Sequence, residues 1–332
     1  MKVSVCITTY NLEKYIGQTL DSILSQKTNF DFEILIGDDA SSDSTPKILK
    51  EYEAKYPNKI KFVLHKRNVG VNRNDYSLIS LAQGEYIAWC DGDDHWINDN
   101  KLQEQADILD SHPECSGVHS WWRDYIEAEN RYHDIKQIQH EWEKQRLGKQ
   151  YAENILLGRS SGTRFSSLMF RSEILKEFFN KYGEEYLRVP HKQNDLAYFC
   201  ILGAWGPFYL QKKITTVYRI RKESLSMTES EAKRINYYYS LMHLLSYLTR
   251  IYNIDIKSTY KIMHPTVNAC ILALSKKVES LAFSLNDIEL LCLKAKYRLS
   301  AGERIIVLSI KHRYIKSVCD LLIKAKSILK KQ

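Results

Sequence analysis

The chain has 332 residues, 44% of them hydrophobic, which is enough for a large buried core in one large or two modest domains. Its formal net charge is +8, but residues 301–332 alone carry eight basic and two acidic side chains, and the rest is nearly balanced. This charge distribution argues against a nucleic-acid-binding surface over the main body of the protein.

The cysteines and the N-terminus indicate an intracellular environment. The seven cysteines are scattered and include no Cys-x-x-Cys pair, so reduced thiols are expected instead of a disulfide framework. The first apolar run is too short for a signal peptide, and no run of about 18 apolar residues predicts a membrane-spanning helix. We therefore expect a cytoplasmic protein.

The N-terminal part of the chain alternates between predicted strands and predicted helices. Short apolar runs with β-branched residues predict strands at residues 3–8, 32–36, 60–64 and 86–90. The segments between them predict helices, one capped by Asn11 and one capped by Thr45 with Pro46 as its first residue. Apolar strands joined by helical crossovers predict a parallel sheet that is covered by helices on both faces.

Polar clusters directly follow three of these strands. They comprise residues 8–11, Asp38 with Asp39, and residues 91–94. In parallel α/β sheets, ligands bind beyond the carboxyl ends of the strands, at the point where the strand order reverses. The three clusters therefore predict one binding site at this edge of the sheet.

The densest cluster is the acidic sequence Asp91-Gly92-Asp93-Asp94. Three carboxylates this close repel one another, and a hard divalent cation is the usual compensation. Such a cation keeps open positions for phosphate oxygens, which predicts a nucleoside diphosphate group as the ligand. The alternative is an acidic turn in solvent, and the clusters at the other two strand ends weaken it.

The rest of the chain divides into a mixed segment and a helical one. The mixed segment predicts a helix at residues 101–112, strands at 117–125 and 166–171, and the interior of a helix at 197–202. Beyond residue 229 long helical patterns dominate, at residues 232–252, 258–283, 287–299 and 303–329. We therefore predict a domain boundary near residue 228.

Four segments occur in an order and at a spacing that are specific to one family. They are residues 3–11, 33–45 with the pattern Asp-Asp-x-Ser-x-Asp-x-Thr, 68–70, and 84–94 with an Asp-x-Asp motif. Together they resemble family 2 of the inverting glycosyltransferases, which build bacterial surface polysaccharides. The resemblance implies an α/β architecture, the GT-A fold, with a Rossmann-like, mainly parallel sheet and helices on both faces.

The resemblance also implies an organisation and a set of site residues. A GT-A domain would span residues 1–228, with a nucleotide half over about 1–116 and an acceptor half over about 117–228, before a helical region at 229–332. The residues that match nucleotide-binding positions are Thr8, Tyr10, Asp39, Arg73 and Asp91. Asp93 matches the ligand of a Mn²⁺ or Mg²⁺ ion that bridges the diphosphate. Asp94 is either a further site residue or a carboxylate that supports the local structure.

Inversion needs a general base on the side of the sugar opposite the departing nucleotide, so the base should come from another part of the chain. Asp195, in the sequence Gln193-Asn194-Asp195, resembles the catalytic base of the family and precedes a predicted apolar helix. The structural alternative is a helix cap, since aspartate is a favoured capping residue.

Residues 217–226 depart from the family pattern. Family members have a Tyr-Arg-x-His segment, and the position of its histidine, near the metal or the diphosphate, corresponds here to Arg221. Arginine does not ligate a metal at neutral pH but clamps phosphate oxygens, so we expect Arg219 or Arg221 to neutralise the diphosphate. Trp96 is the candidate for stacking on an acceptor sugar, although large aromatic side chains more often belong to the core.

Residues 301–332 interleave apolar and basic side chains at helical spacing. Such a segment predicts a peripheral contact with the anionic cytoplasmic face of the inner membrane. The alternatives are an amphipathic helix packed on the protein or a contact in a homodimer.

These patterns together predict a metal-dependent inverting glycosyltransferase of surface polysaccharide synthesis. Its donor would be a nucleotide sugar, UDP-linked, and its acceptor a saccharide or a polyprenyl-linked oligosaccharide. A sugar-nucleotide nucleotidyltransferase would need a Gly-rich phosphate loop after the first strand, which residues 9–11 do not provide. The third alternative is a non-enzymatic, membrane-associated protein that binds sugar nucleotides, and the presence of both Asp93 and Asp195 argues against it.

Overall fold

The computed structural model describes residues 1–159, 162–221, 230–276 and 278–311. The chain divides into two compact units, Met1–Arg188 with Lys192–Ser224 and Val189–His191 with Leu225–Gln332. The predicted domain boundary near residue 228 falls outside the described residues.

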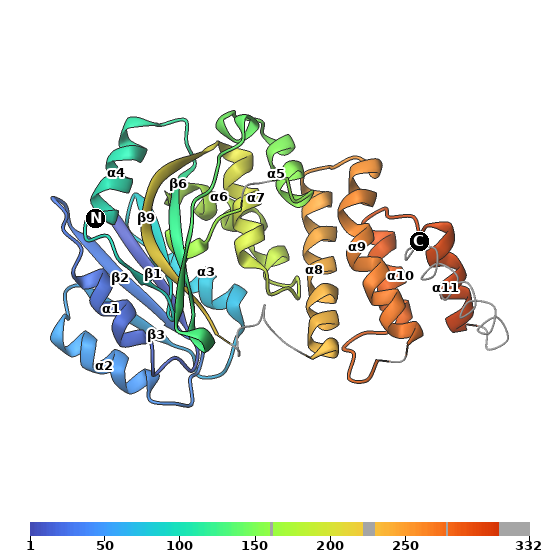
Figure 1. Cartoon of the computed structure of the whole chain (residues 1–332), viewed down its shortest axis with the longest axis horizontal. Coiled ribbons are helices and arrows are strands. Elements are labelled where there is room, and N and C mark those ends of the chain that lie inside the picture. Colours follow the sequence, from blue (N-terminus) through green and yellow to red (C-terminus); the bar gives the residue numbers. More distant parts are fainter. Residues whose placement is uncertain (160–161, 222–229, 277, 312–332) are drawn as a thin grey trace. The chain divides into compact units, whose positions relative to one another are not determined.

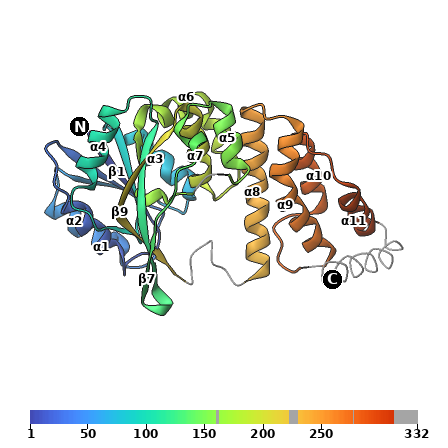
Figure 2. The same ribbon diagram turned by 45° about the horizontal axis from the view of Figure 1, so that its top comes forward.

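The first unit is built on one sheet (Figures 1 and 2). Its strand order is β3-β2-β1-β4-β8-β6-β9-β5, with β7 paired to β6. The strands are β1 (Val3–Thr9), β2 (Phe32–Asp38), β3 (Ile60–Leu64), β4 (Tyr86–Asp91), β5 (His95–Trp96), β6 (Gly117–Ile126), β7 (Arg131–Ile135), β8 (Met169–Arg171) and β9 (Phe208–Ile220). β1 pairs in parallel with β2 and β4, and β2 with β3, whereas β8 is antiparallel to β4 and β6. The predicted parallel sheet thus forms the N-terminal half of a mixed one.

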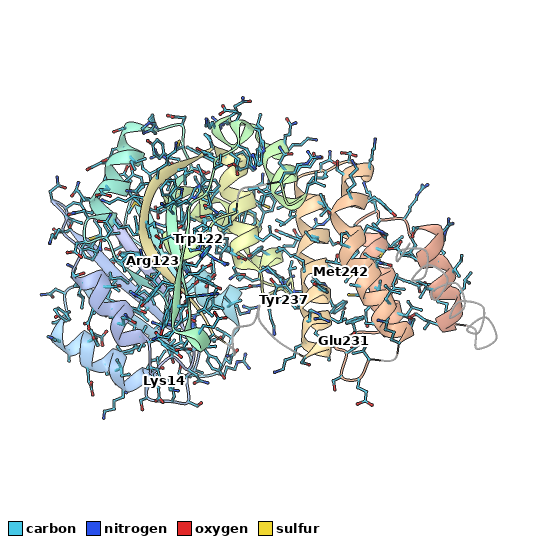
Figure 3. All side chains as sticks on the ribbon, viewed as in Figure 1. Lys14, Trp122, Arg123, Glu231, Tyr237 and Met242 are labelled. Atoms are coloured by element: carbon cyan, nitrogen blue, oxygen red, sulfur yellow. The ribbon has the colours of Figure 1, made fainter. Side chains whose placement is uncertain are left out.

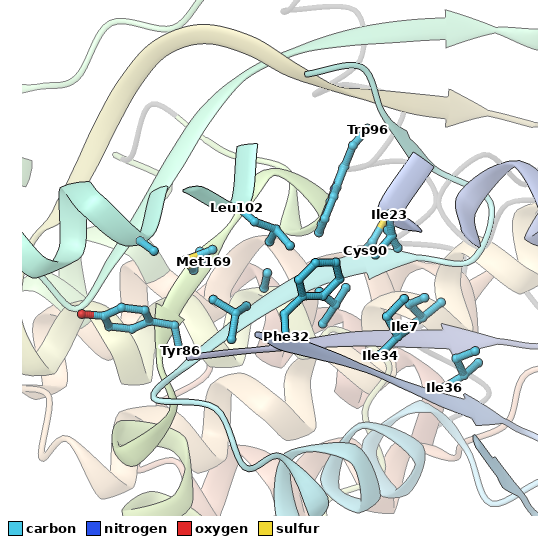
Figure 4. Packing of buried hydrophobic residues seen from close by; sticks show 14 of the residues in the cluster. Ile7, Ile23, Phe32, Ile34, Ile36, Tyr86, Cys90, Trp96, Leu102 and Met169 are labelled. Carbon is cyan, nitrogen blue, oxygen red and sulfur yellow. The ribbon is translucent and has the colours of Figure 1, made fainter. Parts of the chain in front are cut away.

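Helices cover both faces of this sheet. They are α1 (Ile16–Leu24), α2 (Thr45–Lys55), α3 (Val71–Leu81), α4 (Lys101–Ser111), α5 (Lys149–Leu156), α6 (Ser172–Tyr186) and α7 (Asn194–Trp205), with short 3₁₀ turns η1 (Glu127–Glu129), η2 (Glu141–Lys144) and η3 (Phe165–Ser167). On one face Ile7 of β1 belongs to the same buried cluster as Ile23 of α1 and Leu102 of α4 (Figure 4). Because successive strand residues point to opposite faces, Trp89 of β4 packs on the other side, where it meets Tyr198 of α7.

Three predicted element boundaries differ from the structure. Asn11 does not cap α1; it adopts a left-handed backbone with φ of 53°, and its side-chain oxygen accepts a hydrogen bond from the Ser42 N–H at 2.8 Å. Asparagine tolerates this conformation, and here it joins two loops instead of opening a helix. The cap of α2 is Ser44, one residue before the predicted Thr45. The strand predicted at residues 166–171 is shortened to β8, because η3 occupies its first part.

The second unit is helical. Its helices are α8 (Glu231–Ile251), α9 (Ile256–Ser275), α10 (Leu285–Lys294) and α11 (Ala301–Lys311). Met242 of α8, labelled in Figure 3, is fully buried, whereas Glu231 lies in the first turn of that helix. The patterns predicted at 258–283 and 287–299 end earlier, at Ser275 and Lys294. The helix predicted at 303–329 is α11 up to Lys311, and its remainder falls outside the described residues.

α11 is anchored at its start by a buried acidic side chain. Glu303 is 2% exposed and accepts hydrogen bonds from the Ser300 N–H at 2.6 Å and the Tyr297 hydroxyl at 2.8 Å. The Glu303 N–H in turn donates to the Ser300 hydroxyl at 3.2 Å, which completes a reciprocal capping arrangement. In the described part of the chain, no helix is both long enough and apolar enough to cross a membrane.

Candidate active site

The three predicted polar clusters meet at one edge of the sheet, because β1 lies between β2 and β4. Thr8 is aligned with Asp91 across the β1–β4 pair, and the Asp39 N–H donates to the Thr9 carbonyl at 3.0 Å. The Gly92 N–H donates to the Thr8 carbonyl, also at 3.0 Å. A Cβ atom at residue 92 would lie only 2.9 Å from that carbonyl oxygen, so the tight turn requires glycine.

Asp39, the residue predicted to contact the nucleotide base, orders the loop that precedes α3. Its two carboxylate oxygens accept hydrogen bonds from the backbone N–H groups of Val69 at 2.6 Å and Gly70 at 3.0 Å. Each oxygen has a second lone pair, so the carboxylate can still accept a hydrogen bond from a ligand. Asp39 and residues 69–70 are thus joined into one hydrogen-bonded unit at the start of α3.

The other side chains predicted on the nucleotide side are reachable from solvent. Thr8 at the end of β1 is partly exposed, and Tyr10 and Arg73 are exposed. Asp91, the last residue of β4, is partly exposed, and its Oδ1 accepts a hydrogen bond from the indole N–H of Trp89 at 3.2 Å.

Two carboxyl groups of the acidic cluster have raised pKa values, as expected for neighbouring carboxylates that repel one another. Desolvation by the surrounding protein raises the pKa of Asp91 to about 7, and the negative charge of Asp93 is the second cause of this rise. Burial, followed by Asp93 and Asp91, raises the pKa of Asp94 well above its usual range. A cation beside these carboxylates would favour their charged forms.

Asp94 supports the site from within the core. It is 1% exposed, and its Oδ1 accepts a hydrogen bond from the Arg219 backbone N–H at 2.9 Å. Its Oδ2 accepts one from the Ser166 hydroxyl at 2.5 Å. Of the two roles that the sequence left open, the structure favours the supporting one, because both oxygens hold other parts of the fold in place.

Arg221, directly after β9, lies against Asp93. Its Nε and Nη2 atoms lie 2.8 and 2.6 Å from Asp93 Oδ2. The guanidinium also lies over the Tyr15 ring, 5.2 Å from the ring centroid. The arginine predicted for the diphosphate therefore faces the carboxylate predicted for the metal.

Arg219 is engaged differently. Its Nε donates to the Asp93 backbone carbonyl at 3.0 Å, and its Nη2 donates to Gln18 at 2.8 Å. Its guanidinium lies between the rings of Tyr15 and Tyr125, 4.8 and 5.2 Å from their centroids. Arg219 thus fixes the backbone of the acidic cluster, and Arg221 is the arginine that contacts the Asp93 carboxylate.

Asp195 lies in the first turn of α7. The N-cap of this helix is Gln193, so Asp195 does not occupy the capping position that the structural alternative predicted. Its side chain is exposed, and its Oδ1 accepts a hydrogen bond from the Leu196 N–H at 2.8 Å. Although this side chain reaches solvent, the protein around it displaces enough water to raise the pKa of Asp195, and the Leu196 N–H and the Arg164 guanidinium oppose this effect.

Asp195 and the acidic cluster share one electrostatic environment. The charge of Asp195 contributes to the raised pKa of Asp91 on β4. A carboxylate on α7 thus lies within electrostatic range of the end of β4.

Trp96 does not face the site. It is 4% exposed and belongs to the core cluster between the sheet and helices α1 and α4 (Figure 4). Its indole N–H donates to the Ser166 carbonyl at 2.9 Å, and the Lys101 ammonium lies 4.3 Å from its ring centroid. The assignment of Trp96 to the acceptor site is thus corrected, because both faces of a core side chain are already packed.

The sequence also failed to indicate several supporting residues. Ser166 of η3 donates to Asp94 and accepts a hydrogen bond from the Asp91 N–H at 3.0 Å. Arg164 lies over the Tyr218 ring, 3.9 Å from its centroid, and lowers the pKa of Asp195. No local pattern marks these residues, because their partners are distant in the sequence.

The described residues contain no group of three or more His, Cys, Asp or Glu side chains arranged to hold a metal ion. A hard cation that binds through one or two carboxylates together with substrate phosphates does not require such a group. Asp93 offers an oxygen ligand of the right type. Burial and the Asp93 charge raise the pKa of Asp91, so a cation here would stabilise the charged form of that carboxylate. The donor set therefore fits Mn²⁺ or Mg²⁺ bound together with a diphosphate.

A family model described as glycosyl transferase family 2 matches residues 4–179, more than half of the chain. The chain belongs to this family. The family predicted from the four sequence segments is thus confirmed.

Relatives and solved structures extend the comparison beyond the family 2 model. An uncharacterized protein of Mycobacterium tuberculosis is 45% identical over 114 residues, 34% of this chain and 33% of the relative. Abequosyltransferase RfbV of Salmonella typhimurium is 37% identical over 112 residues, 33% of each chain. The chain thus spans about a third of the length of these curated relatives.

The structure of residues 1–349 of S. aureus TarS in complex with UDP-GlcNAc is similar, with a TM-score of 0.61 and 18% identity. The similar region covers 98% of this chain and 92% of the TarS chain. This likeness shows the fold: the mixed sheet with helices on both faces, followed by a helical region, is the GT-A fold of family 2.

Proposed function

We propose that this chain is an inverting glycosyltransferase that moves a sugar from a nucleotide-sugar donor to a saccharide or polyprenyl-linked oligosaccharide in surface polysaccharide synthesis. The observation that carries this proposal is the gathering of polar residues at the ends of adjacent strands β1, β2 and β4, with Asp195 of α7 within electrostatic range of Asp91. Transfer with inversion needs a site for the departing nucleotide and a base from another element. Membership of family 2 supports the same activity.

The nucleotide would lie against the ends of β1, β2 and β4. Thr8, Tyr10, Asp39 and Arg73 would bind the base side, and Asp91 the ribose. Support for a UDP-linked donor comes from the UDP-GlcNAc bound in the similar TarS structure. A uracil-type N–H is a hydrogen-bond donor, and the Asp39 carboxylate retains lone pairs to accept it.

Asp93 would hold Mn²⁺ or Mg²⁺ between the protein and the diphosphate. When bound, this cation supplies positive charge that stabilises the departing nucleoside diphosphate. Arg221, directly after β9, would add its own positive charge by turning from Asp93 towards the phosphate oxygens. A guanidinium suits this task because its planar fork pairs with two phosphate oxygens at once.

Asp195 would accept the proton of the acceptor hydroxyl. As that proton leaves, the hydroxyl oxygen forms a bond to the anomeric carbon, and the bond from that carbon to the diphosphate oxygen breaks on the opposite side. The raised pKa of Asp195 makes this carboxylate a better proton acceptor than an ordinary aspartate.

Replacing Arg221 by alanine is expected to raise the donor KM or lower kcat, with a combined loss of roughly 10- to 100-fold in kcat/KM, the scale of charged hydrogen bonds. Arg221→Lys should lose less, because it keeps the charge but not the fork. Initial rates at varied donor concentration measure both effects. Arg131→Ala, at an exposed arginine that pairs with Glu129, is the matched control. Native kinetics in Arg221→Ala would exclude the phosphate role.

The C-terminal segment is proposed to bind the cytoplasmic face of the inner membrane peripherally. Residues 312–332 carry six basic side chains and one acidic one, and they lie outside the described residues. Truncation after Lys311 keeps Glu303, the buried anchor of α11, and should abolish sedimentation of the chain with vesicles rich in anionic lipid. Vesicles of neutral lipid are the control.

Equal binding of the full and truncated chains would exclude the membrane role of this segment. A change in oligomeric state after the truncation, measured by light scattering, would instead support a homodimer contact.

The proposed function is tested by screening UDP-, GDP- and TDP-linked sugars for release of the nucleoside diphosphate, with and without Mn²⁺. Release from one donor class supports a transferase, whereas release of pyrophosphate from a nucleoside triphosphate and a sugar phosphate would indicate a nucleotidyltransferase. Donor binding without any turnover, in the presence of candidate acceptors, would support a non-enzymatic sugar-nucleotide-binding protein.

A further inference from the structure

A buried carboxyl group contacts the residue next to the proposed catalytic base. Asp75 of α3 is 2% exposed, and its Oδ2 accepts a hydrogen bond from the side-chain amide of Asn194 at 2.5 Å. Asn194 is also buried and is the first residue of α7, so Asp195 follows it directly. One side-chain contact therefore ties α3 to the end of the helix that presents Asp195.

This contact is energetically costly for the fold. Burial raises the pKa of Asp75 to about 8, and the hydrogen bond from Asn194 is the main effect that opposes the rise. Tyr198, one turn further along α7, is fully buried and also lowers the pKa of Asp75. Apolar side chains of similar size would join the two helices without this desolvation cost. A buried polar pair is better explained by the need for one defined position of α7 against α3.

The same turn of α3 also holds the nucleotide side of the site. Asn74, the residue before Asp75, donates from Nδ2 to the Gly37 carbonyl at 2.9 Å, near the end of β2. Asp39, two residues beyond Gly37, accepts a hydrogen bond from the Gly70 N–H at the start of α3. Adjacent residues of one helix are therefore bonded to the nucleotide-binding turn and to the base-bearing helix.

We propose that Asp75 is a positioning residue: by holding Asn194, it fixes the place of Asp195 relative to the bound donor. This inference rests on the proposed function, because it takes Asp195 as the base. Asp75 would not touch the substrate itself. A displacement of about 1 Å at a reacting group costs on the order of 100-fold in rate. Loss of the contact should therefore lower kcat and leave donor binding nearly unchanged.

The test is a double-mutant cycle of Asp75→Leu and Asn194→Ala in the full chain. Each single variant is expected to lose on the order of 10- to 100-fold in kcat, with a donor KM within about threefold of native. The double variant should lose no more than either single one, because both remove the same contact. Asp75→Asn keeps an oxygen that can accept the hydrogen bond from Asn194, so this variant should retain most of the activity that Asp75→Leu loses.

The control separates positioning from general stability. Glu33→Gln changes another buried carboxylate, 2% exposed and bonded to the Ser4 hydroxyl at 2.7 Å, at the opposite end of β1 and β2 from the site. It should lower the melting temperature without changing kcat per mole of donor-binding sites. If Asp75→Leu does not fold, Asn194→Ala and Asp75→Asn carry the test.

Two results would overturn the inference: unchanged kcat in Asn194→Ala, or losses in the two single variants that add in the double one. Either result counts against the positioning role of Asp75 when Asp195→Asn is inactive, because that inactivity shows that Asp195 is the base. An active Asp195→Asn variant would mean instead that the proposed base is wrong, which is a separate failure.

Discussion

Asp195→Asn is expected to lower kcat by on the order of 10³-fold, within the range of 10²–10⁴ that a general base contributes. The amide has nearly the same shape as the carboxylate but cannot accept the proton of the acceptor hydroxyl. Donor affinity should stay near native, because the proposed nucleotide-binding residues Thr8, Asp39 and Asp91 lie at or just beyond the ends of β1, β2 and β4, and Asp195 lies on α7. Initial rates of nucleoside diphosphate release, together with calorimetric titration of the donor, measure the two quantities separately.

The pH dependence of the native chain gives a second readout for Asp195. The base must be ionised to act, so kcat/KM should rise as the pH rises through its pKa in the free enzyme. Because the surrounding protein raises that pKa, the acidic limb should lie above the usual range of an aspartate. Asp107→Asn, at an exposed carboxylate on α4, is the control and should keep this limb. A native rate and an unchanged limb in Asp195→Asn would exclude Asp195 as the base.

Asp93→Asn is expected to lower kcat/KM for the donor by on the order of 100-fold or more, the scale of the charge stabilisation that a metal ion provides. The amide is a weaker ligand for a hard cation, and it also loses the ion pair with Arg221, whose Nη2 lies 2.6 Å from the carboxylate. Binding of Mn²⁺ in the presence of the nucleoside diphosphate, followed by electron paramagnetic resonance, should weaken in parallel.

The matched control for Asp93 is Asp99→Asn. Asp99 follows the same acidic cluster but is exposed and pairs with Lys27 at 3.2 Å, so its removal should leave metal binding and rate unchanged. Native Mn²⁺ affinity in Asp93→Asn would show that another group holds the cation.

The sequence predicts the nucleotide half of the fold because the determinants there are local. Apolar runs with β-branched residues form β1, β2 and β4, and polar residues begin where each run ends. Because ligands bind beyond the ends of parallel strands, the sequence predicts that Thr8, Asp39 and Asp91 lie close together. The pairing of β1 with both β2 and β4 produces this arrangement in the structure.

The other half depends on contacts between distant residues, which no local pattern encodes. His95 and Trp96 form β5 only because they pair with Val217 and Thr216 of β9. The same long-range packing buries Trp96, although its position after the acidic cluster suggested an exposed ring.

The roles within the site were divided by tertiary contacts as well. Asp94 and Asp93 are adjacent carboxylates in the sequence, but the backbone N–H of Arg219 binds Asp94 and the guanidinium of Arg221 binds Asp93. Asp75 has no distinctive sequence context at all. The positioning role proposed for it rests on its burial and on its contact with Asn194.

The most direct test of the proposed transfer is proton NMR of the full chain with an α-linked nucleotide sugar, Mn²⁺ and an acceptor, beside the Asp195→Asn variant. The native chain should release the nucleoside diphosphate and form a β-linked product, and Asp195→Asn should bind the donor but form almost none. An α-linked product, or native turnover by Asp195→Asn, would contradict a single inverting displacement with Asp195 as the base.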